Sequence, residues 1–127
     1  VVLGKQRRFV PVELTCGTKT VRMTALRDTG NSLRDPITGK PVLIVSAEIA
    51  QKLTGLTSDA LRDPVGSMGT VSGLRLIPYQ TVGGTGFLLA ILIHKAKIGN
   101  RQESVLVALS PQNLSNQYQA LTGGLVW

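Results

Sequence analysis

The sequence has one cysteine, one histidine and few aromatic residues, and each shortage excludes something. A single Cys16 cannot form an internal disulfide. Cys16 and His94 together are too few for the ligand set of a zinc site. We therefore predict no metal and no cofactor. With aromatic residues at 4% of the chain, the core has to be built from Val, Leu and Ile.

Acidic residues are also scarce, since 7 Asp and Glu stand against 14 Lys and Arg, and the net charge is +7. Nucleic-acid binders usually combine a basic stripe with aromatic side chains that stack on bases. Here the basic residues are scattered, and the only tight cluster is Lys5-Gln6-Arg7-Arg8. We predict no nucleic-acid partner. The cluster suits the cytoplasmic flank of a membrane segment better.

Long apolar runs are absent as well. The longest, Phe87–Ile93, is about a third of the ~20 residues that a membrane-spanning helix needs. We expect residues 1–127 to be a single soluble domain, with any membrane anchor outside it. A chain that starts at Val1 instead of Met is compatible with a piece of a longer protein.

What the sequence does contain is a series of short strand patterns. Val10, Val12, Leu14 and Cys16 alternate with polar residues, and the same period returns over 21–25 after Gly17-Thr18, which predicts a hairpin. Further strands are predicted over 42–45, 74–78 and 104–109, with a glycine-tipped hairpin in the stretch 81–99. A helix is predicted over 47–53, between an N-cap at Ser46 and a stop at Gly55, and another over 112–121. Residues 56–73 are predicted to be loop, with a weak strand near Val71. The fold class is all-β, with one or two short helices.

One acid stands out because of its position. Asp28 ends the second predicted strand in the tetrapeptide Asp28-Thr29-Gly30-Asn31. Asp-Thr-Gly alone is a common turn sequence. Here a glycine-tipped hairpin follows about fifty residues later, and half of an aspartic protease needs both features. The acid lies on the floor of a cleft, and a mobile hairpin closes over the extended peptide.

The segments 9–33 and 77–90 resemble retropepsins. The segment "DTGNSLRDPITGKPVLIV", residues 28–45, is similar to the sporulation sigma-E factor-processing peptidases. The resemblance implies a closed retropepsin-like barrel with Asp28 as the catalytic acid, supported by Thr29, Gly30 and Asn31. It also implies a flap that binds substrate through Val82, Gly83, Gly84, Thr85 and Gly86.

The same resemblance implies a cellular role. The substrate would be the precursor of a sporulation sigma factor, and a signalling protein from the forespore would activate the enzyme. A membrane-embedded amino-terminal half outside this chain would hold the domain at the cytoplasmic face of the membrane, on the mother-cell side of the septum. Two features need comment. Arg27 occupies a position that is usually apolar in this family, and on a strand its side chain faces away from that of Asp28. The closest match to the second hydrophobic-hydrophobic-Gly element of retropepsins is Ala120-Leu121-Thr122-Gly123.

One chain offers one Asp-Thr-Gly, whereas an aspartic protease needs two carboxylates that share a proton. A half-sized chain meets this need by pairing across a two-fold axis, so we expect an active homodimer with Asp28 from each protomer. The alternative is a non-catalytic basic β-barrel that binds or docks a partner, with Asp28 as a turn residue. Substitution of Asp28 separates the two hypotheses.

Overall fold

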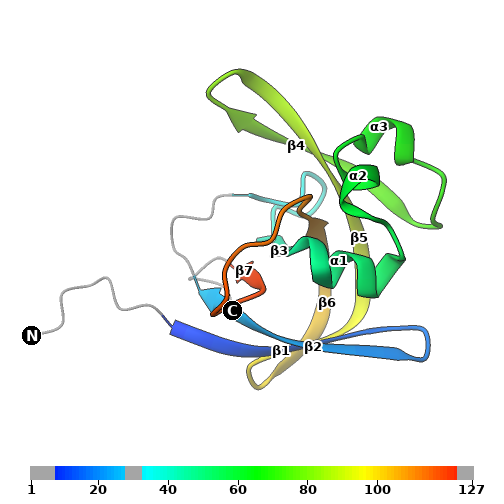
Figure 1. The fold of residues 1–127 in the computed structure, drawn as a ribbon. Helices are drawn as coiled ribbons and strands as arrows, with labels where there is room; N and C mark the ends of the chain where they lie inside the picture. The colour runs from blue at the N-terminus through cyan, green and yellow to red at the C-terminus, as the bar shows by residue number, and fades with distance from the viewer. Residues whose placement is uncertain (1–7, 28–32, 123–127) are drawn as a thin grey trace, which may run out of the picture.

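The computed structural model describes residues 8–27 and 33–122 (Figure 1). This part of the chain contains seven strands and three short helices. The strands are β1 (Arg8–Cys16), β2 (Lys19–Arg27), β3 (Leu43–Val45), β4 (Leu74–Thr81), β5 (Gly84–Ile98), β6 (Arg101–Leu109) and β7 (Ala120–Thr122). The helices are α1 (Ala47–Thr54), α2 (Ser58–Leu61) and α3 (Pro64–Ser67).

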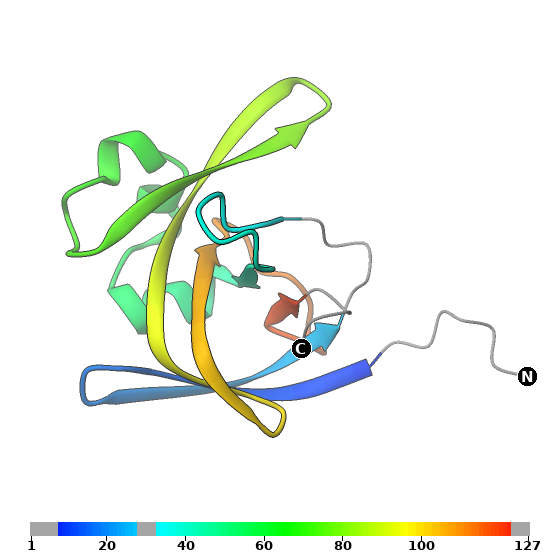
Figure 2. The same ribbon diagram turned by 180° about the vertical axis from the view of Figure 1, so that it is seen from behind.

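Six of these strands close into a barrel. Their order is β1-β2-β7-β3-β6-β5, and β1 pairs back onto β5 to complete the ring. Strand β4 pairs with β5 and continues with it beyond the barrel as a hairpin, which projects from the body in Figures 1 and 2. The predicted all-β fold with a closed barrel and a glycine-tipped hairpin is confirmed.

The first hairpin forms as its sequence pattern predicts. Strands β1 and β2 pair antiparallel from end to end, and Gly17 in the turn has a φ of +63°, a conformation that favours glycine. The alternating apolar residues, such as Leu14 and Met23, point into the barrel and form its main core. This pairing positions the end of β2, whose last residue is Arg27.

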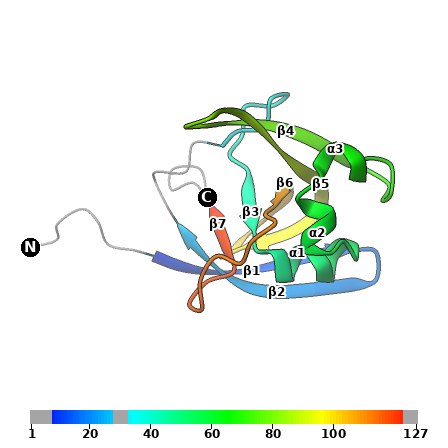
Figure 3. The same ribbon diagram turned by 45° about the horizontal axis from the view of Figure 1, so that its top comes forward.

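Helix α1 also begins and ends as predicted. Ser46 Oγ accepts a hydrogen bond from Ile49 N at 3.4 Å, and Gly55, with a φ of +81°, donates its N–H to Gln51 O at 2.7 Å. The apolar side of the helix, including Ile49 and Leu53, packs into the barrel core. Figure 3 shows α1 lying along β2, with α2 and α3 above it.

Two predictions about irregular segments are wrong. Residues 56–73 contain α2 and α3 and no strand at Val71, because Thr57 and Asp63 cap these two short helices. The predicted helix over 112–121 is absent. There the chain is irregular up to Gln119 and then enters β7, since its backbone groups bond to β3, α1 and β2 instead of to one another.

Within residues 8–27 and 33–122, no helix has the length and apolar character needed to cross a bilayer.

Candidate functional site

The predicted catalytic segment begins where β2 ends. Strand β2 runs up to Arg27, the residue before Asp28, and the description resumes at Leu33. The four predicted site residues Asp28, Thr29, Gly30 and Asn31 therefore lie outside the described residues. Their assignment stays a prediction, and the site is built here from the elements that flank them.

A second strand end lies directly beside that of β2. Strand β7 pairs with β2 in parallel, with Ala25 opposite Ala120, Leu26 opposite Leu121 and Arg27 opposite Thr122. Both strands thus read Ala-Leu-X in matching register, one before Asp28 and the other before Gly123. The two strand ends, about 95 residues apart in the sequence, are neighbours in the fold.

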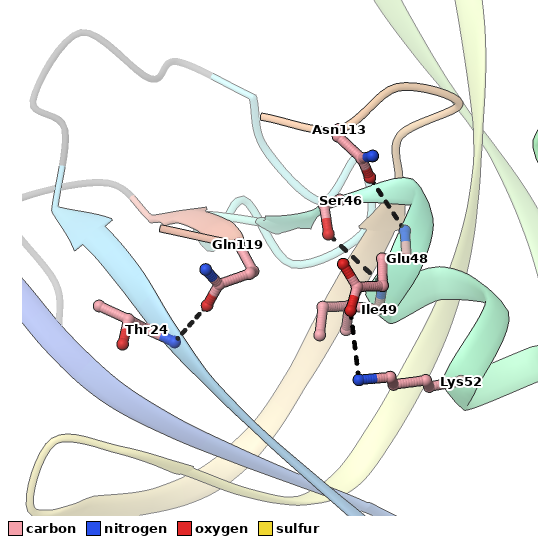
Figure 4. Close-up of polar contacts among 7 residues, drawn as sticks. All are labelled: Thr24, Ser46, Glu48, Ile49, Lys52, Asn113 and Gln119. Carbon is pink, nitrogen blue, oxygen red and sulfur yellow. Dashed lines mark hydrogen bonds and ion pairs between the residues drawn. The ribbon is translucent and has the colours of Figure 1, made fainter. Parts of the chain in front are cut away.

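The end of β2 is held by a residue that the sequence analysis missed. Gln119 N donates to Thr24 O at 2.8 Å, and Gln119 Oε1 accepts from Thr24 N at 3.1 Å (Figure 4). Gln119 O also accepts from Ser46 N at 2.8 Å, next to the start of α1. Gln119 therefore links β2 to the junction between β3 and α1. Its contact on β2, Thr24, lies four residues before Asp28 in the sequence. Because residues 112–121 are predicted to form a helix, no bond between Gln119 and β2 is expected from the sequence.

Two polar atoms at this end of the barrel are buried without a hydrogen-bond partner among the described residues. They are Arg27 Nε and Thr122 Oγ1, on directly opposed residues of β2 and β7. Both follow core alanines, Ala25 and Ala120, by two positions on the same face. Arg27 is thus on the core side of β2, and none of the ion pairs among the described residues includes it.

The remaining carboxylates have structural roles. Six of the seven acidic residues lie in the described chain. Glu13, Glu48, Asp59 and Glu103 each form an ion pair with a nearby Arg or Lys. Asp35 is buried and accepts from Ile37 N at 2.9 Å, and Asp63 caps α3 through Gly66 N at 3.1 Å. The described residues hold no cluster of potential metal ligands.

The predicted flap is a two-stranded hairpin. Strands β4 and β5 pair from Leu74 opposite Ile91 to Thr81 opposite Gly84, and the exposed residues Val82 and Gly83 form the turn. All five predicted flap residues, 82–86, therefore lie at the hairpin tip or just behind it. Their contact with a substrate stays a prediction.

The three flap glycines, Gly83, Gly84 and Gly86, are not equivalent. Only Gly84 of the three has a positive φ, +126°, and a β-carbon there would meet open space. At Gly86 a β-carbon would lie 2.7 Å from Tyr79 Cζ on the paired strand. Gly84 is needed for its backbone angle, whereas Gly86 is needed because an aromatic ring occupies the space of its side chain.

A continuous apolar row joins the end of β2 to the base of the hairpin. On the side of the strands that faces away from the barrel core, register places five residues next to one another across β2, β7, β3, β6 and β5. They are Leu26, Leu121, Ile44, Ala108 and Ala90. A second small core forms over this row, in which Ile77 of the hairpin packs with Val42 and, at its edge, Leu33. The segment that follows residues 28–32 is thereby packed against the hairpin.

Comparison of the sequence with known proteins identifies a family. A family model described as sporulation factor SpoIIGA, peptidase family U4, matches residues 3–123. The chain belongs to this family. The resemblance to sigma-E factor-processing peptidases is thus confirmed.

Two curated members of the SpoIIGA family, both named sporulation sigma-E factor-processing peptidase, are each 29% identical to this chain. The protein of Bacillus subtilis (strain 168) aligns over 84% of the chain and 40% of its own length. The protein of Priestia megaterium aligns over 90% of the chain and 42% of its own length. The chain therefore spans less than half the length of these two relatives. No solved structure matches it significantly.

Proposed function

We propose that this chain is the protease domain of a peptidase that removes the pro-segment of a sporulation sigma factor, and that it is an aspartic endopeptidase of retropepsin type. The parallel pairing of β2 and β7 carries the proposal, because it sets two Ala-Leu strand ends side by side, one of which leads into Asp28-Thr29-Gly30. The hairpin of β4 and β5, packed against the segment after Asp28, supplies a candidate flap. The names of the relatives support the substrate.

In the proposed mechanism, two protomers each contribute Asp28. Two carboxylates about 3 Å apart do not both ionise, so the pair holds one proton. The ionised carboxylate takes a proton from water as that water attacks the carbonyl carbon of the scissile peptide. The protonated carboxyl group donates its proton to the carbonyl oxygen as the tetrahedral intermediate forms. When the intermediate collapses, the C–N bond breaks, the oxygen returns its proton to the carboxylate pair, and the carboxyl group that took a proton from water gives it to the leaving amine. Thr29, Gly30 and Asn31 hold the acid in place.

The flap residues 82–86 bind the substrate backbone in this account. An extended peptide can pair with strand edges through its main-chain groups. Among the residues that the structure describes, strand β4 pairs only with β5, so its other edge has no strand partner in this part of the chain. The regulation that we propose follows the family resemblance: a membrane segment outside this chain holds the domain at the cytoplasmic face of the membrane, and a forespore signalling protein activates it.

Processing of the sigma factor precursor by Asp28→Asn tests this function. The full-length protein, the precursor and the activating signalling protein are co-expressed in a bacterium that does not sporulate, and the mass of the sigma factor is followed. We expect no cleavage by the variant and normal accumulation of the protein. Asp59→Asn is the matched control, because Asp59 is exposed and pairs only with Arg62. Cleavage by Asp28→Asn at the wild-type rate would favour the alternative, a non-catalytic binding or docking module.

A further inference from the structure

The side of the hairpin that carries Gly86 is defined by its cross-strand neighbours. Tyr79 of β4 stands opposite Gly86 of β5, and Ile77 stands opposite Leu88. Side chains two positions apart on a strand share a face, so these four residues form one face, which we call the inner face of the hairpin. Ile77 and Leu88 belong to the small core that also contains Val42, after the predicted catalytic segment.

Tyr79 lies on the inner face close to the hairpin tip, two positions before Thr81, the last residue of β4. A β-carbon at Gly86 would lie 2.7 Å from Tyr79 Cζ, 2.9 Å from its Oη and 3.0 Å from Cε1. The outer end of the ring thus lies directly over the Gly86 backbone. Tyr79 is half-buried, and on the same face it follows the buried Ile77 and the partly buried Leu88. Figures 2 and 3 show this hairpin extending over the segment 33–42.

The contact between the Tyr79 ring and Gly86 also fixes the position of the ring. Gly86 does not have a positive φ, so alanine at this position meets no backbone restriction. The ring alone excludes a larger residue there. An aromatic side chain that covers a glycine on the paired strand is a known way to stabilise a sheet. Tyr79 is therefore seated across the hairpin, with its orientation set by the absence of a side chain at Gly86.

We infer that Tyr79 is a specificity-determining residue, whose ring, held on Gly86, packs against an apolar side chain of the bound peptide. This inference rests on the proposed protease function. The residues of the inner face beside Tyr79 are the apolar Ile77 and Leu88, while Arg75 lies further from the tip and Thr81 nearer to it. The part of the face around the ring therefore favours an apolar residue of the substrate. Aromatic rings supply a large, rigid contact area for such a side chain.

A double-mutant cycle on the full-length protein tests the inference. The variants are Tyr79→Ala, Gly86→Ala and the two together, and kcat and KM are measured on the sigma factor precursor. We expect about a tenfold loss in kcat/KM from either single change, mainly through KM. The double variant should lose no more than Tyr79→Ala alone, because the new methyl group then displaces no ring. Tyr79→Phe should cleave within about twofold of wild type.

Gly84→Ala is the matched control, since Gly84 has a positive φ and a β-carbon added there would meet no atom within 4 Å. The loss of kcat/KM from Gly84→Ala should add to the loss from Tyr79→Ala in a variant that carries both changes. The seating of the ring has its own readout, because Gly86 Hα beneath an aromatic face resonates upfield, and this shift should vanish in Tyr79→Ala.

Several results would overturn the inference. They are wild-type KM in Tyr79→Ala, additive losses in the double variant, or a fall in melting temperature that accounts for the whole loss of activity. A separate result, cleavage that survives Asp28→Asn, would reject the proposed function itself. Profiling cleavage of a peptide mixture adds a direct check: the preference for apolar residues near the cut should weaken in Tyr79→Ala and persist in Tyr79→Phe.

Discussion

Gln119→Ala removes the side chain that holds the end of β2. The variant loses the acceptor for Thr24 N, while the backbone bond from Gln119 N to Thr24 O remains. A hydrogen bond of this kind contributes about 1 kcal/mol net, and a buried N–H left without a partner costs about 1–3 kcal/mol. A polar pocket of about 370 Å³ lined by Gln119, Ser46 and Asn113 gives water access to the site. We therefore expect the lower end, about 1 kcal/mol.

A loss of this size should lower the melting temperature by roughly 4 °C in a domain of this length. Thermal and urea unfolding measure the effect, and processing of the precursor is assayed on the same variants. Activity should fall more than stability suggests, because Thr24 lies four residues before Asp28. Gln119→Glu keeps an oxygen acceptor for Thr24 N and should restore most of both.

Gln117→Ala is the control, since Gln117 is exposed and only its backbone N–H bonds to Ser115 Oγ, at 3.0 Å. If Gln119→Ala and Gln117→Ala unfold at the same temperature and process the precursor equally well, Gln119 does not position β2.

Other predictions concern the helix cap, the buried guanidinium, the flap turn and the assembly. Ser46→Ala should cost about 1 kcal/mol in urea unfolding, because Ile49 N loses its acceptor; no change would mean that water replaces it fully. Arg27→Leu should raise the melting temperature by a few degrees, since Arg27 Nε is buried without a partner; a lower value would reveal a partner outside the described residues. Gly84→Val should reduce processing far more than stability, because φ is +126° at an exposed turn; equal losses would indicate a purely structural role. The isolated domain should be mostly monomeric in sedimentation equilibrium, and a flexible linker between two copies should raise cleavage; a nanomolar dimer would contradict this.

Local features of the fold could be predicted from the sequence because they depend on neighbouring residues. The alternation of Val10 to Cys16 and the Gly17 turn define the first hairpin, and Ser46 and Gly55 define α1. The two short helices could also have been found, since Thr57 and Asp63 are standard N-cap residues and Pro64 suits a first helical turn.

Long-range pairing could not be predicted from periodicity. Strand β7 is three residues long, and its position between β2 and β3 depends on contacts with residues about 75 to 95 positions earlier. The segment before it was assigned to a helix because Pro111 suits a helix start, but tertiary bonds such as Ser46 N to Gln119 O compete with helical ones. The role of Gly86 depends in the same way on a side chain of the opposite strand, Tyr79.

Processing by a mixed dimer tests the central claim most directly. Two full-length protomers with different affinity tags are co-expressed, one of them carrying Asp28→Asn, and dimers that hold both tags are purified in sequence. If Asp28 of each protomer is needed, these dimers should leave the sigma factor precursor uncut, while doubly tagged wild-type dimers cleave it. Half of the wild-type activity in the mixed dimer would show that one Asp28 suffices, and would contradict a site built from two.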